Sequence, residues 1–272
     1  KTDLPYLDGA NATDDWLRLR HEAAMTPDAI ARLAEAGIDA ERIGEQAVRL
    51  ARAVPVSELP GFADGAVSVQ DAGAQLAATF LDVAPGQRVL DACAAPGGKT
   101  GHLLELADGL DVTALESDAA RAVRIHENLA RLNQSATICV GDAAKPDTWW
   151  DGRPFDRILA DVPCSAAGIV RRHPDIRWLR RPADLKALAG LQRDIVRALW
   201  ACLKPGGKLV YVTCSIFPTE GEDQAQWFER HLEDAIRLHA PGQLLPVSPD
   251  AAQTSGFAAG ASPLPLDHDG FF

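Results

Sequence analysis

Two cysteines of the sequence each follow an apolar run that is typical of a buried strand. Cys164 lies in ILADVPCSAAG, and Cys214 lies in LVYVTCSIFP. If these runs are neighbouring parallel strands, their carboxyl ends meet at one edge of a sheet and both thiols face one crevice. A single cysteine after a strand is more often structural, whereas two at equivalent positions point to thiol chemistry. Asp161, just before Cys164, adds a carboxylate to the same place.

A glycine-rich stretch, LDACAAPGGKT, lies between an apolar run and a helix-like segment. Its end matches the P-loop, but Cys93 takes the place of that motif's first glycine, where backbone amides must wrap a phosphate. The G-x-G-x-x-G dinucleotide fingerprint is also missing. The turn still offers amide donors and close backbone approach to a small ligand. The candidate cofactor-binding residues of this loop are Cys93, Ala94, Ala95, Pro96, Gly97, Gly98 and Lys99.

Glu116 ends the next apolar run, LDVTALES. In Rossmann-like sheets an acid about 20 residues beyond the glycines, at the tip of the second strand, hydrogen-bonds ribose hydroxyls. Glu116 alone is as often a solvated acid at a strand end, but it follows a turn suited to a small ligand. An adenosine-containing cofactor without a pyrophosphate fits both observations. S-adenosylmethionine is therefore the leading candidate.

A thiolate beside a methyl donor suits the methylation of a pyrimidine at carbon 5, which is too weak a nucleophile to react unaided. Addition of a thiolate to carbon 6 pushes electron density to carbon 5, and loss of the carbon-5 proton later expels the thiolate. Asp161 can contact nitrogen 3 and the exocyclic amine of a cytosine and stabilise the charge that develops. One cysteine would attack and the other would assist resolution. The spacing alone allows either assignment.

The composition indicates a folded protein with a hydrophobic core. The 272 residues are 47% hydrophobic and 24% charged, with a net charge of −11. No apolar run is long enough to span a membrane, and no leader is visible, although Lys1 at the start suggests that part of a longer protein is missing. Five cysteines without a C-x-x-C pair argue against zinc and disulfides. We expect a cytoplasmic monomer with no metal and no membrane partner.

Positive charge gathers in one segment. Residues 161–208 hold ten Lys or Arg against four Asp or Glu, a local charge of +6 in an acidic chain. Arginine can form two hydrogen bonds to a phosphate, and an aromatic ring can stack on an unpaired base. This combination suits the binding of RNA loops. The alternative is a solvated loop with its tryptophan packed inward. The candidate RNA-binding residues are Arg171, Arg172, His173, Arg177, Trp178, Arg180 and Arg181.

The periodicity places these residues on an α/β fold. Residues 1–53 predict a small α+β unit with a helix at 26–37, which Thr26 and Pro27 begin, and 54–65 read as a linker. The remainder, 66–272, predicts a Rossmann-like domain. It opens with a helix at 68–81. Its strands are expected at 88–93, 111–116, 136–140, 156–161 and 208–214.

Several motifs together resemble the RsmB/Sun family of 16S ribosomal RNA cytosine-carbon-5 methyltransferases. They are LDACAAPGGKT, ALESD, VGDA, ADVPCSAAGIVRRHPDIRW and VYVTCS, in the order and spacing of that family. The resemblance runs from about residue 54 to the end and weakly into the small unit, which is similar to the family's RNA-recognition-like subdomain. It implies a class I S-adenosylmethionine-dependent methyltransferase acting on RNA, with 16S ribosomal RNA as the expected substrate.

The resemblance also implies individual roles. The loop from Cys93 to Lys99 would bind S-adenosylmethionine, with Glu116 on the ribose and Asp142 near the adenine. Asp161 would touch both the cofactor region and the cytosine. The cysteine of the Thr-Cys motif, Cys214, would be the nucleophile, and Cys164 of the Pro-Cys motif would assist base removal or product release.

This chain departs from the family pattern in three respects. DVPCSAAG lacks the glycine that usually follows the Pro-Cys-Ser motif, Glu116 replaces a commoner aspartate, and the family's amino-terminal helical RNA-binding domain is missing from the sequence. DGFF, at the end, stands where a last sheet strand would begin. Two alternatives stay open. One is a methyltransferase for transfer RNA, DNA or protein, and the other is a cofactor-binding module without catalysis.

Overall fold

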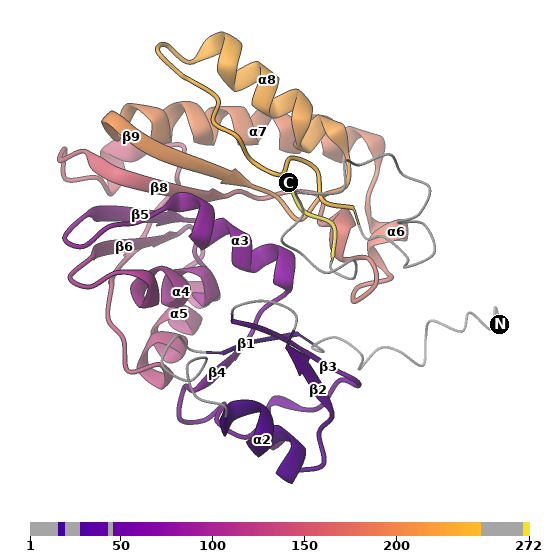
Figure 1. Cartoon of the computed structure of the whole chain (residues 1–272). Coiled ribbons are helices and arrows are strands. Elements are labelled where there is room, and N and C mark those ends of the chain that lie inside the picture. The colour runs from indigo at the N-terminus through magenta and orange to yellow at the C-terminus, as the bar shows by residue number, and fades with distance from the viewer. Residues whose placement is uncertain (1–15, 20–27, 43–45, 246–268) are drawn as a thin grey trace.

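The computed structural model describes residues 16–19, 28–42, 46–245 and 269–272, which form two sheets of different character. A smaller sheet with strand order β2-β3-β1-β4 lies below a larger one with order β7-β6-β5-β8-β9 (Figure 1). Every pairing in the smaller sheet is antiparallel, and every pairing in the larger sheet is parallel. The α/β fold with a parallel central sheet is the predicted one.

The smaller sheet packs one helix, α2, against its strands. Its elements are β1 (Trp16–Leu19), α2 (Asp28–Glu35), β2 (Ala40–Arg42), β3 (Ala47–Leu50) and β4 (Val67–Val69). Leu33 of α2 and Val48 of β3 are fully enclosed in its core. Gly37, at φ +72°, ends the helix as predicted, while Thr26 and Pro27 lie outside the described residues.

The smaller sheet extends further along the chain than the sequence indicates. β4 pairs with β1, so residues 67–69, expected to begin the large domain, complete the small sheet. The helix expected at 68–81 begins only at Ala72, as α3 (Ala72–Leu81), because the Asp71 side chain accepts a hydrogen bond from Gly73 N at 2.7 Å and caps it. Periodicity missed this short strand because three residues carry too little pattern.

The larger sheet alternates strands with crossover helices, as expected of a doubly wound domain. Its strands are β5 (Arg88–Ala92), β6 (Asp111–Glu116), β7 (Thr137–Val140), β8 (Phe155–Asp161) and β9 (Leu203–Val212). β9 begins earlier than the expected 208 because it continues through a Pro-Gly-Gly bend. The bend is accommodated by a positive φ at Gly206 and a register shift opposite Phe155.

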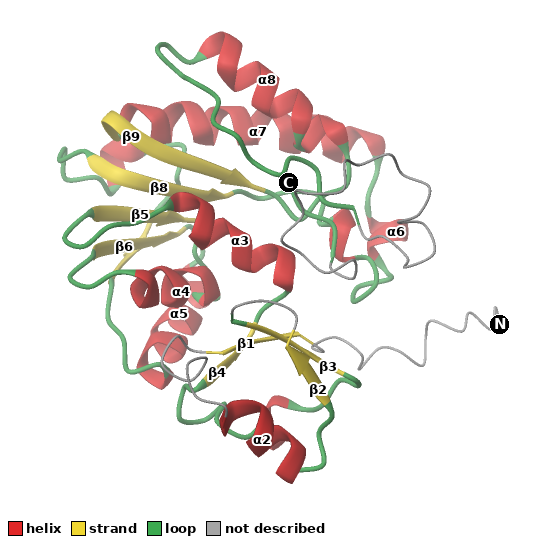
Figure 2. Cartoon of the chain, in the orientation of Figure 1, coloured by secondary structure: helices red, strands yellow, loops and turns green. Residues whose placement is uncertain are grey.

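Helices cover both faces of the larger sheet (Figure 2). They are α4 (Gly98–Leu106), α5 (Ala119–Arg131), α6 (Ile176–Leu179), α7 (Pro182–Ala201) and α8 (Glu222–His231). Side chains of α3, α4 and α5 pack on one face, and those of α7 and α8 pack on the other. Consecutive strand residues alternate between these cores, so Leu90 faces α7 while Val89 faces α3.

Helices α4 and α5 of the large domain form hydrogen bonds with the small one, and α3 also packs against β1. Arg131, the last residue of α5, donates hydrogen bonds to Phe62 O at 2.7 Å and to Val67 O at 3.0 Å. Gly65, at φ +79°, lies so close that a Cβ there would be 2.7 Å from Arg131 O. From α4, His102 Nε2 lies 3.0 Å from Gln46 Oε1. These contacts fix how the two sheets sit relative to each other.

The last residues of the chain lie beside the tip of β9. Thr213 and Phe272 exchange two backbone hydrogen bonds, at 2.8 and 2.9 Å. Gly270 N donates to Gly168 O at 3.0 Å, and a Cβ on Gly168 would collide with Gly270 O. DGFF therefore packs against the segment that follows Cys164.

Candidate active site

The candidate catalytic and cofactor-binding residues described next lie at the carboxyl ends of four adjacent strands. Glu116 is the last residue of β6 and Asp161 the last of β8. Three segments follow the neighbouring strand ends, and we name them the donor loop (Cys93–Lys99), the Pro-Cys loop (162–166) and the Thr-Cys loop (213–217). They follow β5, β8 and β9 respectively, and these three strands are adjacent in the sheet. The predicted crevice thus lies where the sheet topology requires it.

Left-handed backbone shapes the donor loop at both ends. Cys93 has φ +61° and Gly97 has φ +94°. A Cβ on Gly97 would lie 3.1 Å from Ile125 Cα of α5, whereas one on Gly98 would meet nothing within 4 Å. The loop is therefore packed against α5 at Gly97 and open at Gly98. Burial raises the pKa of Cys93 to about 12, so this thiol is not a nucleophile near neutral pH.

Glu116 ties the tip of β6 to the donor loop. Its side chain is 1% exposed, and its carboxylate accepts hydrogen bonds from Ala95 N at 3.3 Å and Asp118 N at 3.0 Å. Arg121 Nη1 lies 3.4 Å away, and Arg121 Nη2 donates to Ala95 O at 3.1 Å. A buried acid with these partners is organised by the loop and is not the solvated strand-end acid of the alternative interpretation.

Asp142 follows β7, beside Glu116, because Gly141 N donates to Glu116 O at 3.0 Å. Its carboxylate accepts from Ala144 N at 3.0 Å and pairs with Lys145 Nζ at 3.0 Å. The hydrogen bond from Lys145 holds the pKa of Asp142 below its usual value. Asp142 therefore lies on the same side of the site as Glu116. It is one strand further from the thiols, because β7 lies outside β6 in the sheet.

An ion pair joins the donor loop to the end of β8, just before the Pro-Cys loop. Lys99 Nζ lies 2.7 Å from Asp161 Oδ2. Burial opposes the charge on Lys99, but the Asp161 carboxylate outweighs it and raises the pKa of Lys99. Lys99 also favours the thiolate form of Cys214 electrostatically. One cation therefore links the region expected to hold the methyl donor with the thiols.

The two thiols face each other, as the sequence predicts. Cys164 Sγ and Cys214 Sγ are 3.4 Å apart. A hydrogen bond from Cys164 lowers the pKa of Cys214, although burial works against it, and the same hydrogen bond raises the pKa of Cys164. Spacing alone left the two cysteines equivalent. The two pKa shifts have opposite directions and favour the thiolate on Cys214, although either sulfur can donate the hydrogen bond.

The basic segment does not act as one surface. Arg172 is half-buried and pairs with Asp269 at 2.6 Å, while Arg171 lies 3.5 Å from the same acid. Arg180 Nε donates to Ser165 O at 2.7 Å and supports the Pro-Cys loop. These three arginines have internal partners that the sequence did not indicate. Trp178 is 66% exposed, so it is not packed inward. His173, Arg177, Trp178 and Arg181 are exposed.

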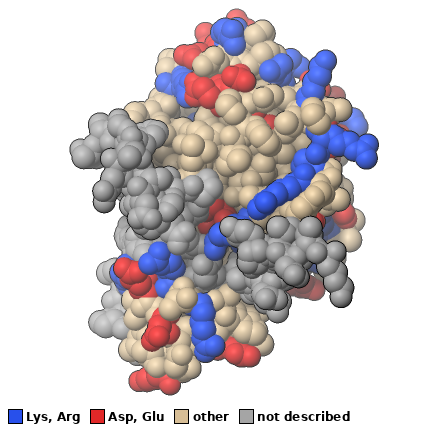
Figure 3. Space-filling view, turned by 90° about the vertical axis from the view of Figure 1, so that its right-hand side faces the viewer, with Lys and Arg blue, Asp and Glu red and all other residues tan. Residues whose placement is uncertain are grey.

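A hollow of about 340 Å³ lies between α6, the start of α7 and the Thr-Cys loop. Val170, Ile176 and Ile216 give it apolar walls, and Arg177 and Arg181 contribute charge. Figure 3 shows the side of the molecule that carries α6, where a line of Lys and Arg side chains crosses a largely uncharged face. The hollow therefore combines apolar and basic groups close to Cys214.

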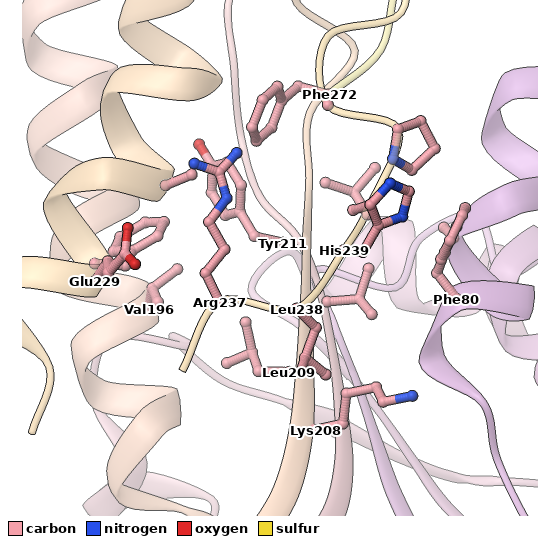
Figure 4. A pocket seen from close by; sticks show the side chains of 18 of the residues that line it. Phe80, Val196, Lys208, Leu209, Tyr211, Glu229, Arg237, Leu238, His239 and Phe272 are labelled. Atoms are coloured by element: carbon pink, nitrogen blue, oxygen red, sulfur yellow. The ribbon is translucent and has the colours of Figure 1, made fainter. Parts of the chain in front are cut away.

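A second hollow, of about 320 Å³, lies away from the thiols on the outer side of β9 (Figure 4). Tyr211, Arg237 and Phe272 border it, together with residues of α3 and α8. None of the expected catalytic or cofactor-binding residues lines it. No sequence pattern predicts this cavity, because it forms between segments far apart along the chain.

Within the described ranges no group of three or more His, Cys, Asp and Glu side chains is arranged to hold a metal ion. No helix in the same ranges is long and apolar enough to cross a membrane. The described cysteines are all free thiols.

The fold is the Rossmann-like fold of class I S-adenosylmethionine-dependent methyltransferases, and its crevice carries a pair of facing thiols. The model of the family 16S rRNA methyltransferase RsmB/F matches residues 78–272, and the chain belongs to this family. The resemblance inferred from the motifs is thereby confirmed.

Relatives and solved structures agree with this assignment. Ribosomal RNA small subunit methyltransferase B of Vibrio vulnificus is 50% identical over 220 residues, which are 80% of this chain and 52% of the relative. The protein of the same name from Xanthomonas campestris is 43% identical over 271 residues, 98% of this chain and 60% of the relative. A methyltransferase homologue from Pyrococcus horikoshii has a TM-score of 0.71 at 28% identity, covering 88% of this chain and 77% of that one. The chain thus spans about half the length of the curated relatives.

Proposed function

We propose that the protein methylates carbon 5 of a cytosine in RNA, with 16S ribosomal RNA as the substrate and S-adenosylmethionine as the methyl donor. The observation that carries the proposal is the pair of thiols 3.4 Å apart beside the Lys99–Asp161 ion pair. A methyltransferase for an acceptor that is already nucleophilic has no need of two facing thiols. The relatives named above support ribosomal RNA as the acceptor.

The donor loop and Glu116 suit S-adenosylmethionine. The loop is open at Gly98, and its backbone packs against α5 without any phosphate-sized nest of glycines. Glu116 would meet the ribose and Asp142 the adenine, with the loop from Cys93 to Lys99 around the rest. When bound there, S-adenosylmethionine supplies an electrophilic methyl group.

The thiols and Asp161 supply the groups that act on the base. Cys214, whose thiolate form is favoured, adds to carbon 6 of the cytosine and leaves electron density on carbon 5. Asp161 contacts nitrogen 3 and the exocyclic amine, where charge develops. Once carbon 5 carries the methyl group, transfer of its proton to solvent restores the double bond and expels Cys214 as a thiolate. Cys164, which keeps its proton, assists this release by donating a hydrogen bond to the departing sulfur.

The exposed part of the basic segment provides contacts for RNA. Arg177 and Arg181 attract phosphates, and the exposed Trp178 offers a face on which a base stacks. Arg171, Arg172 and Arg180 contribute mainly by holding the loops in place. We further propose that the protein works as a monomer in the cytoplasm and needs no metal, because the described crevice is formed by one chain and its chemistry uses thiols.

The test uses RNA that contains 5-fluorocytidine, whose carbon-5 fluorine cannot leave as a proton. Wild-type protein with S-adenosylmethionine and 16S RNA should give a shifted band on a denaturing gel. Cys214→Ala should lose both methylation and the shift. Cys164→Ala on ordinary RNA should accumulate the adduct. An adduct that persists in Cys214→Ala and vanishes in Cys164→Ala would reverse the roles, and no adduct with any RNA despite cofactor binding would contradict the proposal.

A further inference from the structure

A buried carboxylate that the mechanism above does not use lies behind the two thiols. Glu220 ends the 3-10 turn Pro218–Glu220, and its side chain is completely enclosed. No period or motif in the sequence marks this carboxylate, six residues after Cys214. A fully buried acid needs partners, since desolvation of a charge is costly.

The partners of Glu220 are the residues that follow the two cysteines. Oε1 accepts a hydrogen bond from Ser165 N at 2.8 Å, and Oε2 accepts from Ser215 Oγ at 2.6 Å and from Ser165 Oγ. Ser165 comes directly after Cys164, and Ser215 directly after Cys214. A single carboxylate therefore bridges the Pro-Cys loop and the Thr-Cys loop.

A frame of hydrogen bonds from α7 and β9 holds the carboxylate in place. Gln192 Nε2 donates to Glu220 Oε1 at 3.1 Å and to Pro163 O at 3.0 Å, immediately before Cys164. Tyr211 OH donates to the main-chain oxygen of Glu220 at 2.8 Å. The side chain and the main chain of Glu220 are therefore both held by hydrogen bonds from neighbouring elements.

We propose that Glu220 is a positioning residue that sets the distance between the thiols of Cys164 and Cys214. The expected effect on methylation rests on the proposed function, but the alignment of the two thiols does not depend on RNA. Glu220 acts on the loops through the two serines that follow the cysteines, and its charge also raises the pKa of Cys164. Because catalysis is sensitive to misplacement of reacting groups by about 1 Å, a loosened bridge should slow the chemical step while the binding of both substrates is retained.

The first experiment is Glu220→Gln, which keeps the size of the side chain but replaces one acceptor oxygen by a donor group. Ser165 and Ser215 can then no longer both donate to it as they do now. We expect kcat for methylation to fall about 10- to 100-fold, as for a misplaced catalytic group. The KM for RNA and the affinity for S-adenosylmethionine should change less than about twofold, because neither site contains Glu220.

A second readout needs no RNA. Diamide oxidises two adjacent thiols to a disulfide and is itself reduced to the hydrazine, so the rate of Cys164–Cys214 disulfide formation reports how well the loops are aligned. We expect this rate to fall several-fold in Glu220→Gln. Glu222→Gln is the matched control, since Glu222 lies on the same segment but pairs with Arg237 at 2.7 Å on the surface. It should leave both kcat and the disulfide rate unchanged.

The outcomes separate the inference from the proposed function. Unchanged kcat and unchanged disulfide rate in a folded Glu220→Gln protein would overturn the positioning role, and a lower melting temperature alone would mark a purely structural acid. A slowed disulfide rate in a protein whose wild type does not methylate RNA would support positioning and contradict the proposed function. If Glu220→Gln does not fold, Ser215→Ala removes one arm of the bridge and should show the same pattern more weakly.

Discussion

The donor loop and the two cysteine loops form opposite halves of one site, and they are built by different means. The donor loop owes its shape to backbone, with positive φ at Cys93 and Gly97 and close packing of Gly97 on α5. The cysteine loops owe theirs to side chains, through a buried acid that joins Ser165 and Ser215. The half expected to hold the cofactor is thus determined locally. The half expected to hold the base depends on residues brought together by the fold.

The largest effect should come from Lys99→Met, because Lys99 serves both halves. The change leaves the Asp161 carboxylate without its partner at 2.7 Å and removes the cation that favours the Cys214 thiolate. We expect methylation to fall by at least about 100-fold, the loss typical of a preorganised electrostatic group. Transfer of radiolabelled methyl to RNA measures it. Lys204→Met, which removes a surface ion pair with Asp156, should lose less than about twofold.

Gly97→Ala should disturb the donor half alone. A side chain at φ +94° costs about 1–3 kcal/mol, and its Cβ would lie 3.1 Å from Ile125 Cα. We expect the dissociation constant for S-adenosylmethionine, measured by calorimetry, to rise about tenfold or more, which corresponds to about 1.4 kcal/mol. Alkylation of Cys214 by iodoacetamide should continue at its normal rate. An equal loss of thiol reactivity would show that the halves are not independent.

Gly152→Ala provides the control for backbone strain. Gly152 also has a positive φ, of +81°, but a Cβ there meets nothing within 4 Å and the residue lies outside the site. The substitution should lower stability by about 1 kcal/mol and leave cofactor affinity unchanged. If it weakened S-adenosylmethionine binding as much as Gly97→Ala does, the effect would come from global destabilisation.

Asp91, beneath the donor loop, should affect the pH dependence of stability. Asp91 is fully buried and accepts a hydrogen bond from Thr100 Oγ1 at 2.6 Å, and burial raises its pKa to about 7. Between its unfolded pKa of 3.8 and about 7, the unfolded chain has lost this proton and the folded protein has kept it. Stability from this group should therefore fall as the pH rises through that window, by at most about 1.4 kcal/mol per pH unit.

Melting curves of Asp91→Asn test this slope. Between pH 4 and pH 7 the melting temperature of the variant should fall less than that of the wild type, since an amide does not titrate. Asp194→Asn, an exposed acid paired with Arg197 on α7, should melt with the wild-type pH dependence. A wild-type slope in Asp91→Asn would mean that Asp91 is already ionised in the folded protein.

Local patterns in the sequence were enough to predict most of the fold and the donor half. Apolar runs located the strands that end at Glu116 and Asp161, and the glycine turn located the start of α4. Equivalent positions after two strands also predicted that the thiols face each other. These features depend on short stretches of chain whose geometry is largely fixed by their own residues.

The parts that the sequence did not reveal depend on distant partners. Glu220 meets Ser165 across 55 positions of sequence, and Arg172 meets Asp269 across 97. Neither pairing has a period or a motif. The sequence therefore predicts an RNA contact for Arg172 and no role for Glu220. Spacing likewise leaves the two thiols equivalent, whereas their opposite pKa shifts arise from a contact between residues 50 positions apart.

The contacts of α4 and α5 with the small sheet have a consequence for substrate geometry. Both helices begin beside the donor loop, and Arg131 and His102 connect them to the small unit. The small sheet is thereby held at a set spacing from the methyl-donor site. A bound RNA that reached from one to the other would have to match that spacing, and its own shape would then decide which nucleotide arrives at the crevice.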